Sequence, residues 1–326
     1  MERRKDLDFA KGVGIILMVL GHCYSAGNGE NILCWLYSFH MPLFFIIPGI
    51  IYGVYKRTTV DRLYLIAKRK VKNLMVPYFF FATATAIAFC VIGRKTLSDL
   101  GEYMRRIVLL QGINAMWFIP CFLFSELIFI IFSRAKNSWR YITALVAIGF
   151  LAVNFPVLKS ISSMLQTIVI GVSFIAIGFL CGKIYSKPIK RMTWLICAVI
   201  HLGLALLNQC VDLAYGVYGN PLLYYVNGML GTFVAIHSFA YVSQYRFSEF
   251  LVWLGKNTII VLCTSSFVIE MLRLVDYKLT NSAMPSFGYA EGIILCVLTM
   301  MIEVIIILFC KRYLWFVTGK THTKTL

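Results

Sequence analysis

Two ionisable residues in the first apolar segment lie where they could do chemistry. The segment LDFAKGVGIILMVLGH runs from Leu7 to His22 and carries Lys11 near its start. If this segment is a helix, the spacing of eleven residues puts Lys11 and His22 on nearly the same face, about 16 Å apart along the axis. Because an ionisable side chain is expensive to place inside a bilayer, both residues are candidates for a functional role.

A cation at one end of a helix and an imidazole at the other suit a long, anionic acyl donor such as acyl coenzyme A. Lys11 would hold its phosphates at the cytoplasmic mouth, and the thioester would reach His22. A neutral imidazole could take the proton from an attacking hydroxyl, or carry the acyl group transiently. Two plainer alternatives stay open: Lys11 could extend its ammonium group to the cytoplasmic interface, and His22 could lie at the opposite interface.

A second histidine follows in the segment YSFHMPLFFIIPG, from Tyr37 to Gly49. His40 begins the second apolar run, so a tight hairpin through residues 27–31 would bring His22 and His40 to a similar depth. His40 is therefore a further catalytic candidate. Its alternative role is to position the hairpin through a hydrogen bond.

The composition indicates a membrane protein. Hydrophobic residues make up 60% of the 326 and charged residues only 14%, with a mean hydropathy of +0.80. In a soluble protein the net charge of +17 would suggest nucleic acid. Here its distribution between apolar runs argues against a nucleic-acid partner. We predict an all-α, polytopic helical bundle in the cell membrane, with residues 1–326 forming a single domain.

Ten apolar runs are long enough to cross a bilayer. They cover residues 9–25, 34–54, 74–93, 116–133, 140–157, 164–182, 193–210, 223–243, 250–271 and 288–310. Lys and Arg are concentrated in the segments that face inward if the amino terminus is cytoplasmic, so the positive-inside rule places both termini in the cytoplasm. Lys256 falls inside the ninth run. Asp8 and Lys11, together with the lack of a small-residue cleavage pattern, favour a retained first helix over a cleaved signal peptide.

Beyond these patterns, the chain resembles the acyltransferase-3 family of integral membrane acyltransferases, particularly its fucose 4-O-acetylase-like branch. The family's motif of a cation ahead of a histidine falls on Lys11 and His22, and FHMPLFFIIPG follows. The basic RxxR motif falls on Arg69 and Lys72 in AKRKVKNLMVPY, with Lys replacing the second Arg. Later matches, in chain order, are WFIPCFLFSE, YGNPLLYYVNGMLG and LGKNTIIVL.

One position departs from the family pattern. Relatives often end the last of these segments with a histidine, whereas this chain has Cys263 and Thr264. The role of this position is therefore open.

The resemblance implies transfer of an acyl group, usually acetyl, from cytoplasmic acyl coenzyme A to a hydroxyl of a glycan or lipid-linked saccharide. Arg69 and Lys72 share a helix face and would bind the donor's phosphates with Lys11, although membrane topology and anionic lipid also explain such a basic cluster. Glu126, in the fourth run, would orient His22; a structural hydrogen bond is an equal alternative. Acetyl coenzyme A is the expected donor substrate, and no metal is expected.

A transporter or flippase for a small polar or saccharide substrate is the main alternative function. Glu270, Glu291 and Glu303 and the interruption at Pro48 would suit substrate passage. The two halves of the chain show no matching pair of interrupted runs, and the polar groups concentrate in the first three runs, which favours a single reaction site. A scaffold without activity would leave the spacing of the first motif unexplained.

The remaining candidates are predicted to be structural. His201 and His237 lie singly in apolar runs, which predicts packed and hydrogen-bonded rings. The ten cysteines show no CxxC or Cys/His metal spacing, so we predict small buried hydrophobic side chains. No GxSxG elbow, HExxH helix or Walker loop occurs in the sequence, so serine hydrolases, zinc proteases and nucleotide-driven pumps are not supported.

Overall fold

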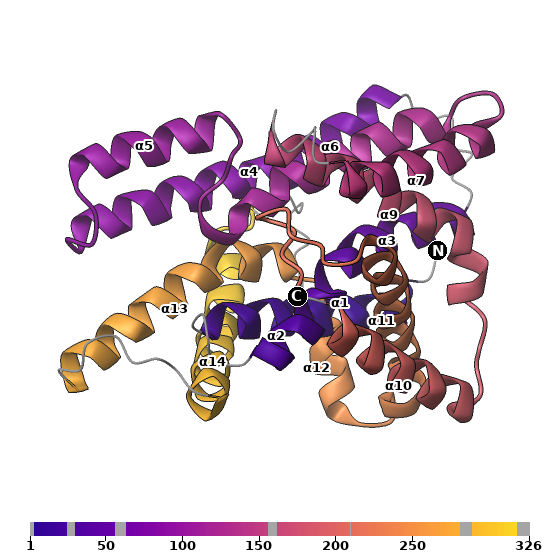
Figure 1. Ribbon diagram of the computed structural model, residues 1–326. Helices are drawn as coiled ribbons and strands as arrows, with labels where there is room; N and C mark the ends of the chain where they lie inside the picture. Colours follow the sequence, from indigo (N-terminus) through magenta and orange to yellow (C-terminus); the bar gives the residue numbers. More distant parts are fainter. Residues whose placement is uncertain are drawn as a thin grey trace. The chain divides into compact units, whose positions relative to one another are not determined.

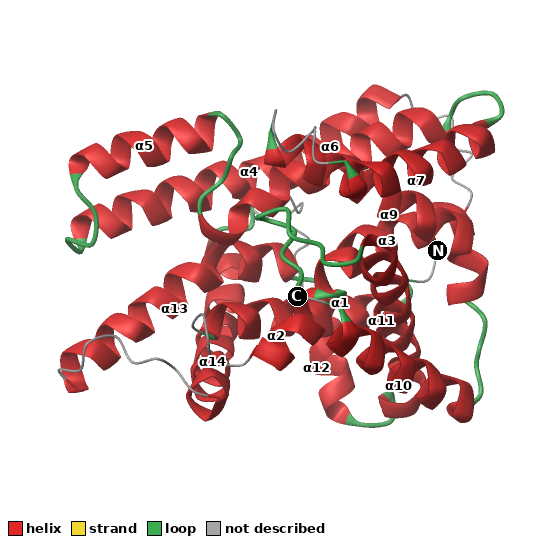
Figure 2. Ribbon diagram, in the orientation of Figure 1, coloured by secondary structure: helices red, strands yellow, loops and turns green. Residues whose placement is uncertain are grey.

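The computed structural model describes residues 3–24, 30–55, 63–155, 162–208, 210–280 and 289–317. Within these ranges the chain is helical and forms no strand, apart from an isolated bridge between Asp212 and Val217 (Figure 2). The prediction of an all-α fold is confirmed.

The chain divides into two compact units, each assembled from three separate stretches of sequence. Unit 1 comprises Met1–Gly21, Gly29–Val60 and Phe124–Lys256. Unit 2 comprises His22–Asn28, Asp61–Leu123 and Asn257–Leu326. That residues 1–326 form a single domain stays a prediction.

Unit 1 is organised around the helices α3 (His40–Tyr55) and α9 (Ser163–Tyr185), which are in close contact (Figure 1). A Cβ added at Gly49 of α3 would collide with the Ile175 carbonyl of α9, and one added at Gly178 would collide with the Ile46 carbonyl. Small residues let membrane helices approach closely, because lipid supplies little hydrophobic force between them. Two helices are shared between the units: α1 (Lys5–Cys23) belongs to unit 1 up to Gly21, and α6 (Phe118–Ser133) belongs to it from Phe124. The other helices of unit 1 are α2 (Glu30–Tyr37), α3 (His40–Tyr55), α7 (Ser138–Asn154), α9 (Ser163–Tyr185), α10 (Arg191–Leu207), α11 (Pro221–Val242) and α12 (Arg246–Gly255).

In unit 2, the amphipathic helix α5 (Leu97–Val108) lies along the long apolar helix α4 (Leu63–Val91) (Figure 1). The Tyr78 hydroxyl donates to the Ile107 carbonyl at 3.1 Å and accepts from the Gly112 N–H at 3.1 Å. Thr96 and Asp99 form a capping box, and the hydrogen bonds from Thr96 lower the pKa of the Asp99 carboxyl. The complete helices of this unit are α4 (Leu63–Val91), α5 (Leu97–Val108), η1 (Asn114–Trp117), α13 (Thr258–Thr280) and α14 (Tyr289–Tyr313).

Helices occupy all ten predicted membrane runs. Seven segments are long and apolar enough to cross a membrane: Ile32–Val54, Leu63–Val91, Asn114–Ser133, Ser163–Tyr185, Pro221–Val242, Thr258–Thr280 and Ala290–Tyr313. The shorter helices α7 and α10 and the charged helix α1 lie in the other three runs. A polytopic helical membrane bundle is therefore confirmed, while ten crossings and two cytoplasmic termini stay predictions.

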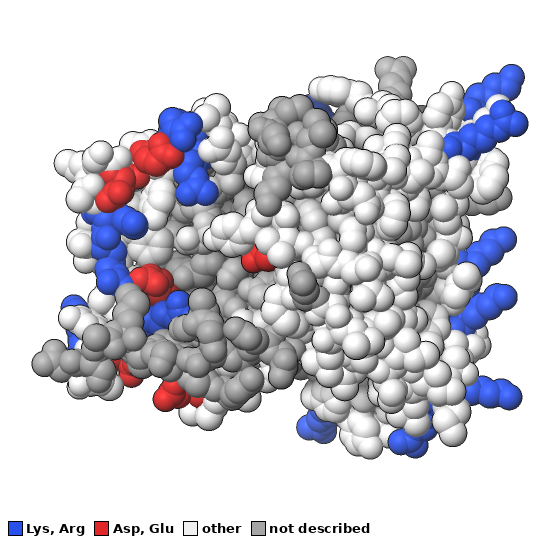
Figure 3. Space-filling view, viewed as in Figure 1, with Lys and Arg blue, Asp and Glu red and all other residues white. Residues whose placement is uncertain are grey.

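The surface is also that of a membrane protein. On α14, apolar side chains spaced three or four residues apart are each more than half exposed: Ile294, Val297, Met301, Ile305 and Leu308. On unit 1, Figure 3 shows a wide uncharged surface with Lys and Arg gathered at its margins. Lipid contact explains so much exposed apolar area.

The ninth predicted run, 250–271, is not one helix. Helix α12 ends at Gly255 and α13 begins at Thr258, so the run is broken at Lys256 and Asn257. The Lys256 N–H closes the last turn of α12 on the Val252 carbonyl at 3.2 Å, and its side chain is exposed. Glycine weakens a helix, and Gly255 is the last residue of α12. Lys256 therefore does not lie within an uninterrupted helical span.

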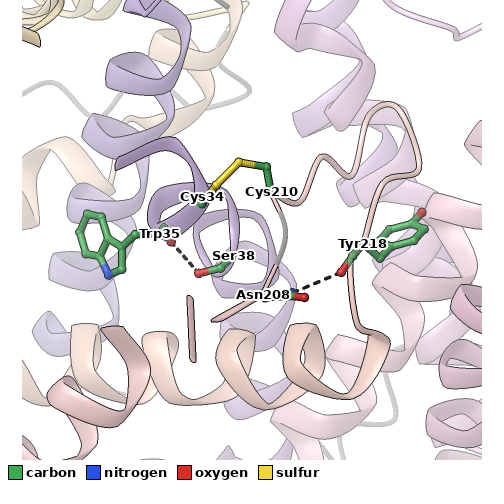
Figure 4. Close-up of a disulfide and its surroundings, with 6 residues drawn as sticks. All are labelled: Cys34, Trp35, Ser38, Asn208, Cys210 and Tyr218. Carbon is green, nitrogen blue, oxygen red and sulfur yellow. Dashed lines mark hydrogen bonds between the residues drawn. A yellow bond between two sulfur atoms is a disulfide. The ribbon is translucent and has the colours of Figure 1, made fainter. Parts of the chain in front are cut away.

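A disulfide joins Cys34 in α2 to Cys210, three residues beyond α10, with 4.4 Å between the Cα atoms (Figure 4). The prediction that the cysteines are unpaired hydrophobic residues is wrong for this pair. The two residues are 176 positions apart and are brought together by the packing of α2 against α10. The other eight cysteines form no disulfide, and Cys23, Cys121, Cys263, Cys296 and Cys310 are buried.

Candidate active site

The first motif lies on one continuous helix, as its spacing predicts. Helix α1 carries Lys11 in its first half and His22 in its last turn, about three turns further on. The His22 side chain is half-buried. Its imidazole makes no hydrogen bond within the described part of the chain, so neither ring nitrogen is engaged by a described residue.

A guanidinium group lies at the end of α1, in unit 2. Arg273 of α13 donates through one Nη atom to the His22 carbonyl at 3.0 Å and to the Cys23 carbonyl at 3.2 Å. The last carbonyls of a helix lack helical donors and carry partial negative charge, which a cation offsets. From the sequence, Arg273 is only a cation near the outer end of an apolar run. Its contact with α1 is a tertiary feature that no local motif signals.

Helix α14 also packs against this end of α1. A Cβ added at Gly292 of α14 would collide with the ring of Tyr24, the residue that follows α1. The backbone that carries His22 is therefore held by α13 through Arg273 and by α14 through this contact.

Two of the carboxylates that would suit a transporter have partners in unit 2. Glu270, one turn before Arg273 on α13, forms an ion pair with Arg94. Glu303 of α14 is fully buried, and its two carboxylate oxygens lie 2.8 and 2.9 Å from the Thr264 hydroxyl, which donates its one hydrogen to the carboxylate. Cys263 and Thr264 stand where the family resemblance led us to expect a histidine. In this chain Cys263 is buried, and Thr264 contacts a buried carboxylate.

Glu126 is buried in α6 and has a structural partner. The Tyr52 hydroxyl of α3 donates to its carboxylate at 3.0 Å. Both residues belong to unit 1, whereas His22 belongs to unit 2. The observed contact matches the structural alternative for Glu126, and orientation of His22 by this carboxylate stays a prediction.

His40 also has a contact that fits its alternative role. Its Nδ1 atom lies 2.8 Å from the Leu36 carbonyl, and its ring meets the Tyr37 ring edge-on at 5.1 Å between centroids. These contacts tie the start of α3 to the end of α2. Residues 27–29 of the expected hairpin lie outside the described residues, and the convergence of His40 with His22 stays a prediction.

The three cations predicted to bind the donor differ in their surroundings. Lys11 pairs with Asp8 at 2.6 Å, and Asp8 also pairs with Arg3. Arg69 and Lys72 lie one turn apart on α4 with exposed side chains, and neither forms an ion pair with any described residue. The common face of Arg69 and Lys72 is confirmed. Lys11 belongs to unit 1 and the other two to unit 2, so their joint binding of phosphates stays a prediction.

The remaining histidines are packed and hydrogen-bonded, as predicted. His237 uses both ring nitrogens, which lie 2.9 Å from the Phe233 and Lys187 carbonyls. The Nδ1 atom of His201 lies 2.6 Å from the Asn227 side-chain oxygen. Among the described residues, no group of three or more His, Cys, Asp or Glu side chains could hold a metal ion.

Comparison with known proteins finds a matching family model and a relative. A family model described as an acyltransferase domain matches residues 4–309. The nodulation protein NolL of Sinorhizobium fredii (strain NBRC 101917 / NGR234) is 31% identical over 200 residues, which is 57% of this chain. The match spans 50% of that relative's length. No solved structure matches the chain.

Proposed function

Since this chain belongs to the acyltransferase-3 family of integral membrane proteins, we propose that it transfers an acetyl group from acyl coenzyme A to a hydroxyl of a glycan or lipid-linked saccharide. Membership of the family makes the protein a membrane acyltransferase. The donor, the acyl group and the acceptor are parts of the proposal. It is carried by the half-buried imidazole of His22, which has no hydrogen-bond partner among the described residues and lies at an end of α1 held by Arg273.

His22 is the proposed general base. One ring nitrogen takes the proton of the acceptor hydroxyl while the hydroxyl oxygen attacks the thioester carbonyl carbon. The carbon–sulfur bond then breaks, and the departing coenzyme A thiolate takes the proton back from the imidazolium. The positive charge of Arg273 lies close enough to His22 to interact with it electrostatically. The same charge favours anionic groups beside the imidazole, including the oxyanion that develops on the thioester carbonyl.

The donor would enter from the cytoplasm with its phosphates near the amino-terminal half of α1. Lys11 lies about three turns before His22 on this helix, a length that suits the arm between the phosphates and the thioester. Arg69 and Lys72 are the further proposed phosphate ligands. The transporter alternative receives no support from Glu270 and Glu303, because Glu270 pairs with Arg94 and Glu303 accepts from Thr264.

The test is transfer of radiolabelled acetyl from acetyl coenzyme A by the protein in nanodiscs, with a lipid-linked saccharide extract as acceptor source. We expect His22→Ala to lower transfer by about 10²- to 10⁴-fold, the usual contribution of a general base. His237→Gln is the control, because both ring nitrogens of His237 lie at backbone carbonyls. Both variants should elute and melt like the wild type.

Two results would contradict the proposal. Full transfer by His22→Ala would remove the imidazole from the mechanism. A folded wild-type protein that neither binds nor consumes the donor would favour the transporter.

A further inference from the structure

Helices α1 and α12 touch backbone to backbone in unit 1. A Cβ added at Gly12 would collide with the Leu251 carbonyl, and one added at Gly255 would collide with the Asp8 carbonyl and approach the Gly12 nitrogen. Two glycines therefore remove the side chains that would separate these helices. As a result, the end of α12 lies beside the first half of α1.

The charged groups at this contact are mostly paired. The ion pairs join Arg4 with Asp6, Lys5 with Glu249 at 2.9 Å, and Asp8 with both Arg3 and Lys11. Lys256, directly after Gly255, is exposed and has no carboxylate partner among the described residues. Gly255, the residue before Lys256, touches the Asp8 carbonyl, and Lys11 pairs with the Asp8 carboxylate, so both lysines lie near the same residue of α1. The contact thus keeps an excess of positive charge.

We propose that Lys256 binds phosphate together with Lys11, forming part of the donor site. The ligand would be a phosphate monoester or diphosphate, because two neighbouring ammonium groups suit a dianionic group that offers several acceptor oxygens. This inference rests on the proposed function, in which the donor carries such phosphates. It assigns a role to the segment LGKNT: Gly255 permits the helix contact, and the next residue supplies the charge.

Binding of a lipid phosphate would use the same chemistry, so the test separates the two sources. Coenzyme A binding is measured by calorimetry in nanodiscs of neutral lipid, with pantetheine as the probe that lacks the nucleotide phosphates. Lys256→Gln should weaken coenzyme A binding by about three- to tenfold and leave pantetheine binding unchanged. Lys256→Arg, which keeps the charge, should retain most of the affinity.

Lys136→Gln is the matched control, since Lys136 is an exposed lysine elsewhere in unit 1 and forms no ion pair with a described residue. Its coenzyme A affinity should equal that of the wild type. Equal affinity in wild type and Lys256→Gln would overturn this assignment alone. A difference that appears only in nanodiscs of anionic lipid would also overturn it, in favour of a lipid headgroup. A folded wild type that binds no coenzyme A would defeat the proposed function as well.

Discussion

At the scale of single residues, Arg273 is the main addition to the candidate site. It bonds the backbone carbonyls of His22 and Cys23, and its charge lies beside the imidazole that the family motif singles out. A guanidinium suits this position, because its planar fork can donate to two carbonyls from one end. We therefore propose that Arg273 is a positioning residue for His22.

Changing Arg273 should reduce turnover without preventing donor binding. We expect Arg273→Gln to lower kcat by about tenfold or more, because the end of α1 loses charged hydrogen bonds. Arg273→Lys should recover part of the rate, since lysine restores the positive charge but not the planar guanidinium group. Steady-state kinetics and coenzyme A binding would separate kcat from affinity. If Arg273→Gln turned over at the wild-type rate, Arg273 would have no positioning role.

At the scale of elements, the contact between α1 and α12 depends on glycine. Helix α12 ends beside Asp8, where no space for a Cβ exists at Gly255. A contrasting glycine is Gly203 of α10, which has nothing within 4 Å of its added Cβ. The two positions therefore form a matched pair for the same substitution.

We expect Gly255→Ala to destabilise the fold by roughly 1–3 kcal/mol, the usual cost of overpacking a close contact. Gly203→Ala should be neutral or stabilise α10 by about 0.5–1 kcal/mol, because alanine is the better helix former. Unfolding in detergent, followed by intrinsic tryptophan fluorescence, would compare them. Equal stability of the two variants would show that α12 can move away from α1 at little cost.

At the scale of the whole molecule, the disulfide bears on orientation in the membrane. With a cytoplasmic amino terminus, the ten-run topology places both Cys34 and Cys210 at the outer surface. Structural disulfides persist in oxidising compartments and are rare in the cytosol. The bond between these residues agrees with the orientation that the positive-inside rule predicts.

Sided labelling checks this orientation. In right-side-out vesicles, a reductant and a maleimide that cannot cross the membrane should open the bond and then label Cys34 and Cys210. Inside-out vesicles should show no such labelling. The double variant Cys34→Ser, Cys210→Ser measures how much maleimide labels the other eight cysteines. Labelling of this pair from the cytoplasmic side would reverse the predicted topology.

Membrane class, helical fold and the first motif were determined by the sequence itself. Apolar runs of about 20 residues favour helices in a bilayer, because a helix satisfies its backbone groups within the segment. Helical geometry then sets the spacing of Lys11 and His22 and the common face of Arg69 and Lys72. These inferences use only local periodicity and charge.

Only the tertiary structure decided which distant residues meet. The contact of Arg273 with α1, the pairing of Thr264 with Glu303 and the disulfide between Cys34 and Cys210 each join separate stretches of the chain. The break at Lys256 was also missed, because hydropathy averages over a short interruption. These contacts depend on how the surfaces of packed helices fit together, at glycines and at buried polar groups. The periodic pattern of a single sequence does not reveal which helix surfaces fit each other.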